Sequence, residues 1–157
     1  MLIAAGPFTL LCVLSAALAW IDLRKGIIPD WMNLAIVALG MSKALLWGGA
    51  PAALDAVLQG IAIGIVIWLL RRLYFRARGV QGLGLGDVKF LAAAGIWVGI
   101  AGLPTLLLIA TLTALGSIGV LLLSGRALTT RTSLPFGPFL AIALVVTAAL
   151  QQLSWCC

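Results

Sequence analysis

The chain has 157 residues, of which 64% are hydrophobic and 9% are charged, and its mean hydropathy is +1.24. A water-soluble domain of this size cannot use so much apolar surface, so we expect a protein embedded in a lipid bilayer. The sequence contains no His and no Glu, which excludes imidazole metal sites and His-containing catalytic triads and leaves mainly Asp, Ser, Thr, Cys, Tyr and Lys for any catalysis.

Six apolar segments follow one another along the chain, and we expect each to form a membrane helix. They cover residues 7–21, 31–47, 52–70, 88–100, 103–123 and 136–153. Gly and Pro interrupt the pattern at residues 47–51 and 99–104, so these stretches should join adjacent helices. The predicted fold is therefore all-α: a single membrane-embedded domain, residues 1–157, with six transmembrane helices.

The basic residues gather in alternate connections. The first, third and fifth connections carry nine of the ten, and only Lys43 departs from the pattern. The positive-inside rule then places these connections in the cytoplasm and both termini outside it. The first segment resembles a signal-peptide core, but its basic residues, Arg24 and Lys25, follow it, so we expect a retained helix. We expect the cluster at residues 71–78 to contact anionic lipid rather than nucleic acid.

The chain has four carboxylates, Asp22, Asp30, Asp55 and Asp87. Asp22 closes the first predicted helix and Asp87 opens the fourth, so both should lie at the same depth on the cytoplasmic side. Two such carboxylates can act as an acid–base pair, in which one draws a proton from water and the other polarises a carbonyl. The helix dipoles suggest Asp87 as the base and Asp22 as the acid. Asp55 is expected near the outer surface.

A structural explanation stays open for each residue. An Asp at the start of a helix is often an N-cap, and an Asp beside Arg and Lys at a membrane edge is often a solvated anchor. Gly84 and Gly86 beside Asp87 favour catalysis, because they leave room for the backbone of an extended peptide to approach. Other uses of the pair are proton relay or cation binding in a small proton-coupled transporter. A non-catalytic pilus or secretion assembly subunit is a further alternative.

Three motifs together carry a resemblance to a known family. GLGLGDVKF contains a GxGDxK pattern, IDLRKGIIPD has Asp22 followed seven residues later by Pro29, and LPFGPFLA opens the last helix. In this order the motifs resemble the type IV prepilin peptidases, which are GxGD aspartic proteases of the bacterial or archaeal inner membrane. The resemblance implies catalysis by Asp22 and Asp87, with water as the nucleophile and without a metal or cofactor.

The resemblance also implies a substrate class. Such enzymes remove the short basic leader from prepilins or pseudopilins at the cytoplasmic face, for pilus assembly or protein secretion. Larger family members carry paired CxxC motifs and also methylate the new N-terminus; the sequence here has no CxxC. We therefore expect the minimal, peptidase-only form, without N-methyltransferase activity or use of S-adenosylmethionine.

Six further residues are candidates for supporting roles. Lys89 could orient the substrate or a nearby acid, or could simply extend toward the membrane surface. Asp30 is expected to cap the second helix after Pro29, and it is the spare acid on that side for a basic leader. Pro135, Gly137 and Pro138 should give the last helix a rigid start near the two catalytic candidates.

Overall fold

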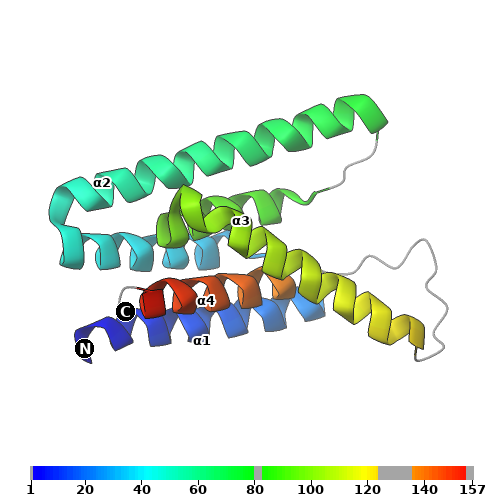
Figure 1. Cartoon of the computed structure of the whole chain (residues 1–157). Coiled ribbons are helices and arrows are strands. Elements are labelled where there is room, and N and C mark those ends of the chain that lie inside the picture. Colours follow the sequence, from blue (N-terminus) through cyan, green and yellow to red (C-terminus); the bar gives the residue numbers. More distant parts are fainter. Residues whose placement is uncertain (1, 80–82, 124–135, 155–157) are drawn as a thin grey trace.

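The computed structural model describes residues 2–79, 83–123 and 136–154. Four helices make up its regular structure: α1 (Leu2–Lys25), α2 (Asp30–Arg78), α3 (Leu85–Leu123) and α4 (Gly137–Ser154) (Figure 1). The described residues contain no strand, and the all-α prediction is confirmed.

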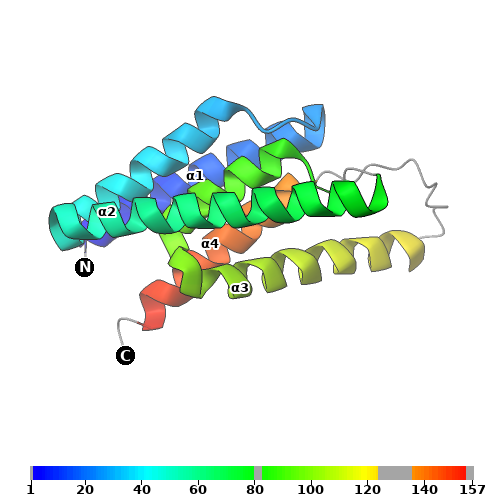
Figure 2. The ribbon, with the colours of Figure 1, turned by 90° about the horizontal axis from the view of Figure 1, so that it is seen from above.

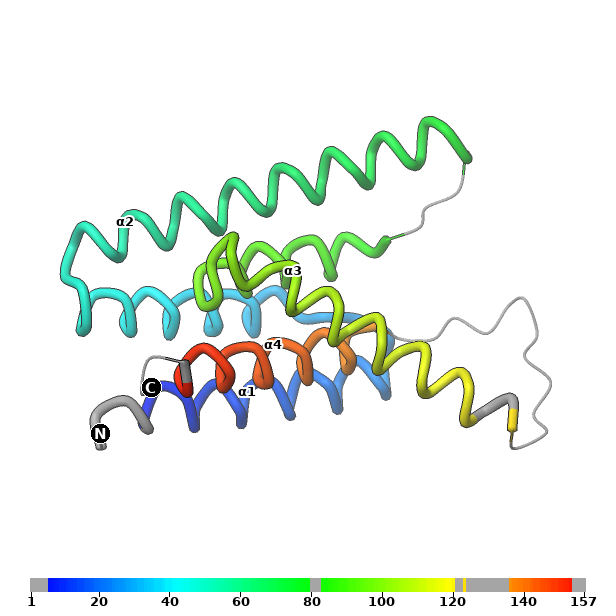
Figure 3. Tube along the Cα trace, in the orientation of Figure 1, coloured from blue at the N-terminus to red at the C-terminus, as the bar shows by residue number. Residues whose placement is uncertain are grey.

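The number of separate helices differs from the prediction. Figure 3 shows α2 folding back on itself and α3 changing direction partway along. The backbone leaves helical geometry at Gly49 (φ 68°, ψ −165°) and at Gly99 (φ 67°, ψ −179°). Glycine adopts such positive φ values without steric cost, so one residue suffices where a loop was expected. In the described residues, the second and third predicted segments are therefore joined in α2 and the fourth and fifth in α3, and both breaks lie within the predicted Gly/Pro interruptions.

Two glutamines satisfy the backbone groups that the break in α3 exposes. The Ile100 N–H donates to Gln59 Oε1 at 2.9 Å, and Gln151 Nε2 donates to the Val98 carbonyl at 2.8 Å. Asp55 accepts a hydrogen bond from Gln59 Nε2 at 2.6 Å, which orients the Gln59 side chain. Polar groups of α2 and α4 thus replace the helical hydrogen bonds that a sharp bend removes.

Glycine allows the part of α2 after its break and the part of α3 before its break to approach closely. A Cβ added at Gly95 would lie 3.3 Å from the Cα of Gly60 and 2.6 Å from Ile63 Cδ1. Small residues at such a crossing let two membrane helices pack by direct backbone contact. Among the four helices of the described residues, α2 and α3 share the most extensive contact.

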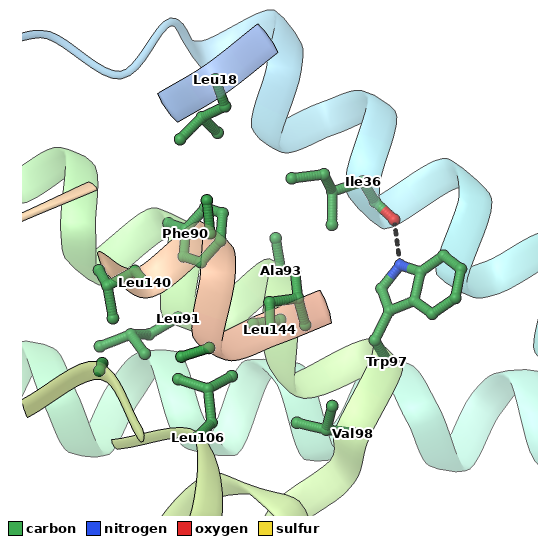
Figure 4. Packing of buried hydrophobic residues seen from close by; sticks show 14 of the residues in the cluster. Leu18, Ile36, Phe90, Leu91, Ala93, Trp97, Val98, Leu106, Leu140 and Leu144 are labelled. Atoms are coloured by element: carbon green, nitrogen blue, oxygen red, sulfur yellow. Dashed lines mark hydrogen bonds between the residues drawn. The ribbon is translucent and has the colours of Figure 1, made fainter. Parts of the chain in front are cut away.

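The buried core joins all four helices. Phe90 of α3 is fully buried and faces Leu18 of α1 and Leu140 of α4 (Figure 4). Trp97 donates from its indole nitrogen to the Ile36 carbonyl at 2.9 Å, so its one polar atom is satisfied inside the core (Figure 4). This core fixes α1, α3 and α4 against one another and thereby fixes the residues at their ends.

The outer surface is apolar, with many exposed Leu, Ile, Val and Trp side chains. Within the described ranges, three helical stretches are long and apolar enough to cross a membrane: Gly6–Lys25, Asp30–Arg78 and Leu85–Val120. A shorter apolar helix covers Gly137–Leu153. This pattern indicates a multi-pass membrane protein.

The helix ends that carry the three motifs meet at one end of the molecule. The end of α1 and the starts of α2, α3 and α4 all lie toward the right in Figure 1, and the view from above in Figure 2 agrees. The fold-back of α2 lies at the opposite end (Figure 1). Residues far apart in the sequence can therefore share one site.

Candidate active site

Asp22 lies in the last turn of α1 and is 5% exposed. The N–H of Gly137, the first residue of α4, donates to Asp22 Oδ2 at 3.0 Å. A carboxylate at a helix N-terminus accepts a free backbone donor and meets the positive end of the helix dipole. Asp22 thus binds the start of a helix 115 residues later in the chain.

The contact leaves no room for a side chain at Gly137. A Cβ built there would lie 2.5 Å from Asp22 Oδ2 and 2.7 Å from Asp22 Cγ. Real Cβ atoms essentially never approach so closely, so glycine is required for the carboxylate to reach the N–H. The contact between Asp22 and the Gly137 N–H therefore depends on the absence of a side chain at residue 137.

Asp87 is the third residue of α3, not its N-cap. Gly84 precedes the helix, and its carbonyl accepts from the Val88 N–H at 3.3 Å. The Asp87 carboxylate accepts a hydrogen bond from the Gly84 backbone. A carboxylate three residues after the cap that binds the cap N–H is one half of a capping box. The half-buried Asp87 side chain is held by its own helix.

The two carboxylates lie close enough for their charges to interact. Each binds a backbone N–H at the N-terminus of a helix, α4 for Asp22 and α3 for Asp87. Asp22 does lie in the last turn of α1, as predicted, but its carboxylate also meets the positive end of the α4 dipole. The helix dipoles therefore do not identify which of the two groups is the base.

The two motif glycines have different surroundings. A Cβ at Gly84 would lie 3.2 Å from Asp87 Oδ2, and Gly84 is exposed. A Cβ at Gly86 would lie 3.3 Å from Ile28 Cβ in the α1–α2 connection. The absence of a side chain at Gly86 thus leaves room for Ile28 to pack against α3. Of the two glycines, Gly84 is the one that is exposed and lies beside the Asp87 carboxylate.

Asp30 does not cap α2, contrary to the prediction. Pro29 occupies the N-cap position with φ −66° and ψ 135°, and no side chain caps the helix there. Asp30 is the first helical residue, and both of its carboxylate oxygens bind Lys89 Nζ, at 2.7 and 2.8 Å. Asp30 is therefore not a spare acid for a basic leader, and Lys89 ties the start of α3 to the start of α2.

We expect this ion pair to contribute modestly, because the two side chains are 54% and 73% exposed. Exposed pairs are worth about 0.2–1 kcal/mol. Asp30→Asn should lower kcat/KM less than about tenfold, since 1.4 kcal/mol corresponds to a factor of ten. Asp30→Lys and Lys89→Asp should each lower kcat/KM, and the double variant that combines them should recover part of the loss seen in each single variant. Purely additive losses in this double-mutant cycle, measured by peptide cleavage, would show that the pair does not position α3.

The third motif is described from residue 136 onward, so Pro135 lies outside the described residues. Gly137 and Pro138 are buried in the first turn of α4, where the missing N–H of proline costs no helical hydrogen bond. The rings of Phe136 and Phe139 contact each other with centroids 6.3 Å apart. Of the candidate supporting residues, Gly84 and Gly137 are those whose backbone hydrogen-bonds to a catalytic candidate, Gly84 to Asp87 and Gly137 to Asp22.

Sequence reasoning missed the part that Arg71 plays. Its Nε donates to the Leu83 carbonyl at 2.8 Å, so α2 holds the segment directly before the GxGD motif. The sequence offers no signal for this contact, because Arg71 is one of four arginines in a basic cluster and nothing in the sequence distinguishes it from the others.

Among the described residues, no three Asp or Cys side chains lie together as a metal-ligand set.

The sequence model of the type IV leader peptidase family matches residues 9–120. The chain belongs to this family. The match covers most of α1, all of α2 and nearly all of α3, and so includes both aspartates of the candidate site.

Curated relatives agree with this family. The chain is 40% identical over 128 residues to a prepilin leader peptidase/N-methyltransferase of Aeromonas salmonicida, covering 81% of this chain and 43% of the relative. The protein of that name in Burkholderia pseudomallei is 35% identical over 131 residues (83% and 42%), and that in Xanthomonas campestris is 36% identical over 141 residues (88% and 47%). The chain thus spans less than half the length of these relatives. No solved structure matches it.

Proposed function

We propose that the protein is a membrane aspartic endopeptidase that removes the basic leader from type IV prepilins or pseudopilins. Membership of the leader peptidase family and the names of the relatives support this reaction. The observation that carries the assignment to residues is the pairing of Asp22 and Asp87. They come from different helices, and each is fixed by a backbone N–H at the end of the molecule where the three motifs meet.

The proposed chemistry needs a water and one proton shared by the two carboxylates. One carboxylate takes a proton from the water as its oxygen attacks the scissile carbonyl, while the protonated partner donates to the carbonyl oxygen. The tetrahedral intermediate then collapses, the C–N bond breaks, and the leaving nitrogen takes up a proton from the pair. The roles of base and acid stay unassigned between Asp22 and Asp87, because coupled groups titrate as a pair.

The experiment that tests the reaction is incubation of the purified protein with a prepilin in detergent, followed by mass spectrometry. The proposal expects two products, the leader and the mature chain, from a single cut. Cation or proton flux in liposomes without cleavage would favour the transporter alternative, and binding of the prepilin without cleavage would favour the assembly subunit. The location of the pair at one end of the helices, rather than midway along them, argues against a relay across the membrane.

We further propose that the helices cross the inner membrane six times, with both termini outside the cytoplasm. The breaks at Gly49 and Gly99 divide α2 and α3 into two segments each, and the basic residues of α1, of the end of α2 and of the start of α3 lie at the active-site end. Single cysteines can test this in a background without native cysteines. A membrane-impermeant maleimide added outside intact cells should label residue 49 and spare residue 78; the reverse pattern would overturn this orientation.

A further inference from the structure

Arg71 differs from the other arginines at the end of α2. Arg72, Arg76 and Arg78 are exposed, whereas Arg71 is half-buried. Its Nε donates to the Leu83 carbonyl at 2.8 Å, so this arginine contacts the chain that leads into α3. The other three remain at the surface, where a lipid headgroup can reach them. Burial and a fixed backbone contact thus set Arg71 apart from the basic cluster that surrounds it.

The Leu83 carbonyl and the Gly84 N–H belong to the same peptide group. A peptide group is planar, and in the trans form its C=O and N–H point in opposite directions. Arg71 binds the carbonyl on one side of this group. On the other side, the Asp87 carboxylate accepts a hydrogen bond from the Gly84 N–H. A cation and a candidate catalytic acid are therefore joined by one rigid group.

The peptide group is held firmly on one side only. The Leu83 side chain packs against the buried core, and the Leu83 carbonyl is bound by Arg71. Gly84 is exposed and has no Cβ to restrict its backbone. Rotation of the peptide group would turn its N–H away from Asp87, and the bond from Arg71 opposes that rotation. The direction of the N–H thus depends on Arg71.

The charge of Arg71 strengthens the same arrangement. A guanidinium stays protonated, and a hydrogen bond from a charged donor is about twice as strong as a neutral one. A carbonyl that accepts such a bond is polarised, which makes the N–H of the same peptide group a better donor. Arg71 can therefore act on the Asp87 carboxylate without touching it.

We propose that Arg71 is a positioning residue for Asp87 and acts through the Leu83–Gly84 peptide group. The inference rests on the proposed function. It gives both aspartates a comparable support, since Asp22 is held by the first N–H of α4. Loss of Arg71 should slow the chemical step and leave substrate binding almost unchanged, because a reacting group loses its orientation.

Two variants of equal side-chain length separate the hydrogen bond from packing. In Arg71→Gln, Nε2 is as many bonds from Cα as Nε is in arginine, so it can donate to the same carbonyl without a charge. Arg71→Met has the same length and no donor. For Arg71→Met we expect kcat for prepilin cleavage to fall about 10²-fold, as for a misplaced reacting group. Arg71→Gln should stay within about tenfold of the wild type, because its neutral bond is about half as strong. KM should change little in either variant.

Arg72→Met is the matched control. Arg72 is the exposed neighbour of Arg71, and its guanidinium lies 5.3 Å from the centroid of the Trp68 ring. The variant removes the same charge from the same helix and should keep the wild-type kcat. Equal losses in Arg71→Met and Arg72→Met would overturn the inference, and so would equal losses in Arg71→Met and Arg71→Gln. A raised KM with an unchanged kcat would identify Arg71 as a substrate-binding residue and would also overturn it.

Thermal unfolding in detergent shows whether each variant folds. If Arg71→Met does not fold, Arg71→Lys takes its place, since it keeps the charge but puts a carbon atom where Nε lies in arginine. Arg71→Lys should then be less active than Arg71→Gln. The reverse order would show that charge, and not the hydrogen bond to Leu83, is what matters.

A second measurement does not depend on cleavage. Aspartate labelled with ¹³C in its side-chain carboxyl gives four NMR signals, one for each Asp of the chain, and Asp87→Asn identifies the signal of Asp87. Arg71→Met should shift this signal and leave that of Asp55 in place, and Arg72→Met should shift neither. An unchanged Asp87 signal in a folded Arg71 variant would overturn the inference. If the wild type cuts no prepilin, the proposed function fails, and this signal alone decides whether Arg71 positions Asp87.

Discussion

Asp22→Asn and Asp87→Asn should each reduce leader cleavage by at least about 10³-fold while leaving the protein folded. Proton transfer by a positioned group contributes about 10²–10⁴-fold, and groups that act as a unit lose almost everything when either is removed. Asn has the shape of Asp and keeps an oxygen that can accept the Gly137 or Gly84 N–H, so the helix ends should stay in place. The measurement is single-turnover cleavage of a prepilin, with thermal unfolding in detergent as the test of folding.

Asp55→Asn is the matched control for this pair. Asp55 lies in the part of α2 after its fold-back and is exposed, and it accepts a hydrogen bond from Gln59, which supports the break in α3. The variant should lower thermal stability slightly and keep full cleavage in the remaining folded protein. Wild-type turnover in either Asp22→Asn or Asp87→Asn would show that the pair is not the catalytic dyad.

Gly137→Ala should reduce cleavage by about 10²-fold, with a smaller effect on stability. The added Cβ would fall 2.5 Å from Asp22 Oδ2, so the carboxylate must turn away or α4 must shift. Either movement breaks the hydrogen bond that fixes Asp22, and misplacement of a reacting group by about 1 Å can cost about 10²-fold in rate. The measurement is kcat for prepilin cleavage together with the melting temperature.

Gly116→Ala separates this steric effect from a general effect of replacing glycine in a helix. A Cβ at Gly116 of α3 meets nothing within 4 Å. Alanine is favoured over glycine in a helix by about 1 kcal/mol, so this variant should be as active as the wild type and equally or more stable. Equal activity of Gly137→Ala and Gly116→Ala would contradict the proposal that the Gly137 contact positions Asp22.

Much of the architecture could be predicted because the bilayer restricts the choices. Apolar length indicated helices, and Gly and Pro marked both places where the chain turns. The predicted loops between helices were replaced by single glycines at positive φ, Gly49 and Gly99, and sequence patterns do not separate such a break from a short loop. Asp22 and Asp87 could be identified as candidate catalytic residues because the chain has only four side-chain carboxylates.

The contacts that fix the site could not be predicted, because each joins distant parts of the chain. The Gly137 N–H reaches Asp22 across 115 residues, and Lys89 reaches Asp30 across 59. The dipole argument for Asp22 considered only α1, whereas the carboxylate faces the start of α4. Asp30 was assigned as a cap from its neighbour Pro29, but the proline itself occupies that position and leaves the carboxylate free to bind Lys89.

The most direct measurement is a structure of the protein bound to a leader-peptide analogue whose scissile amide is replaced by a hydroxyethylene group. Such an analogue imitates the tetrahedral intermediate and should bind tightly if the site is built for that state. We expect its hydroxyl to lie between Asp22 and Asp87, within about 2.5–3.0 Å of an oxygen of each. A hydroxyl bound by other residues, or carboxylates too far apart to share it, would contradict catalysis by this pair.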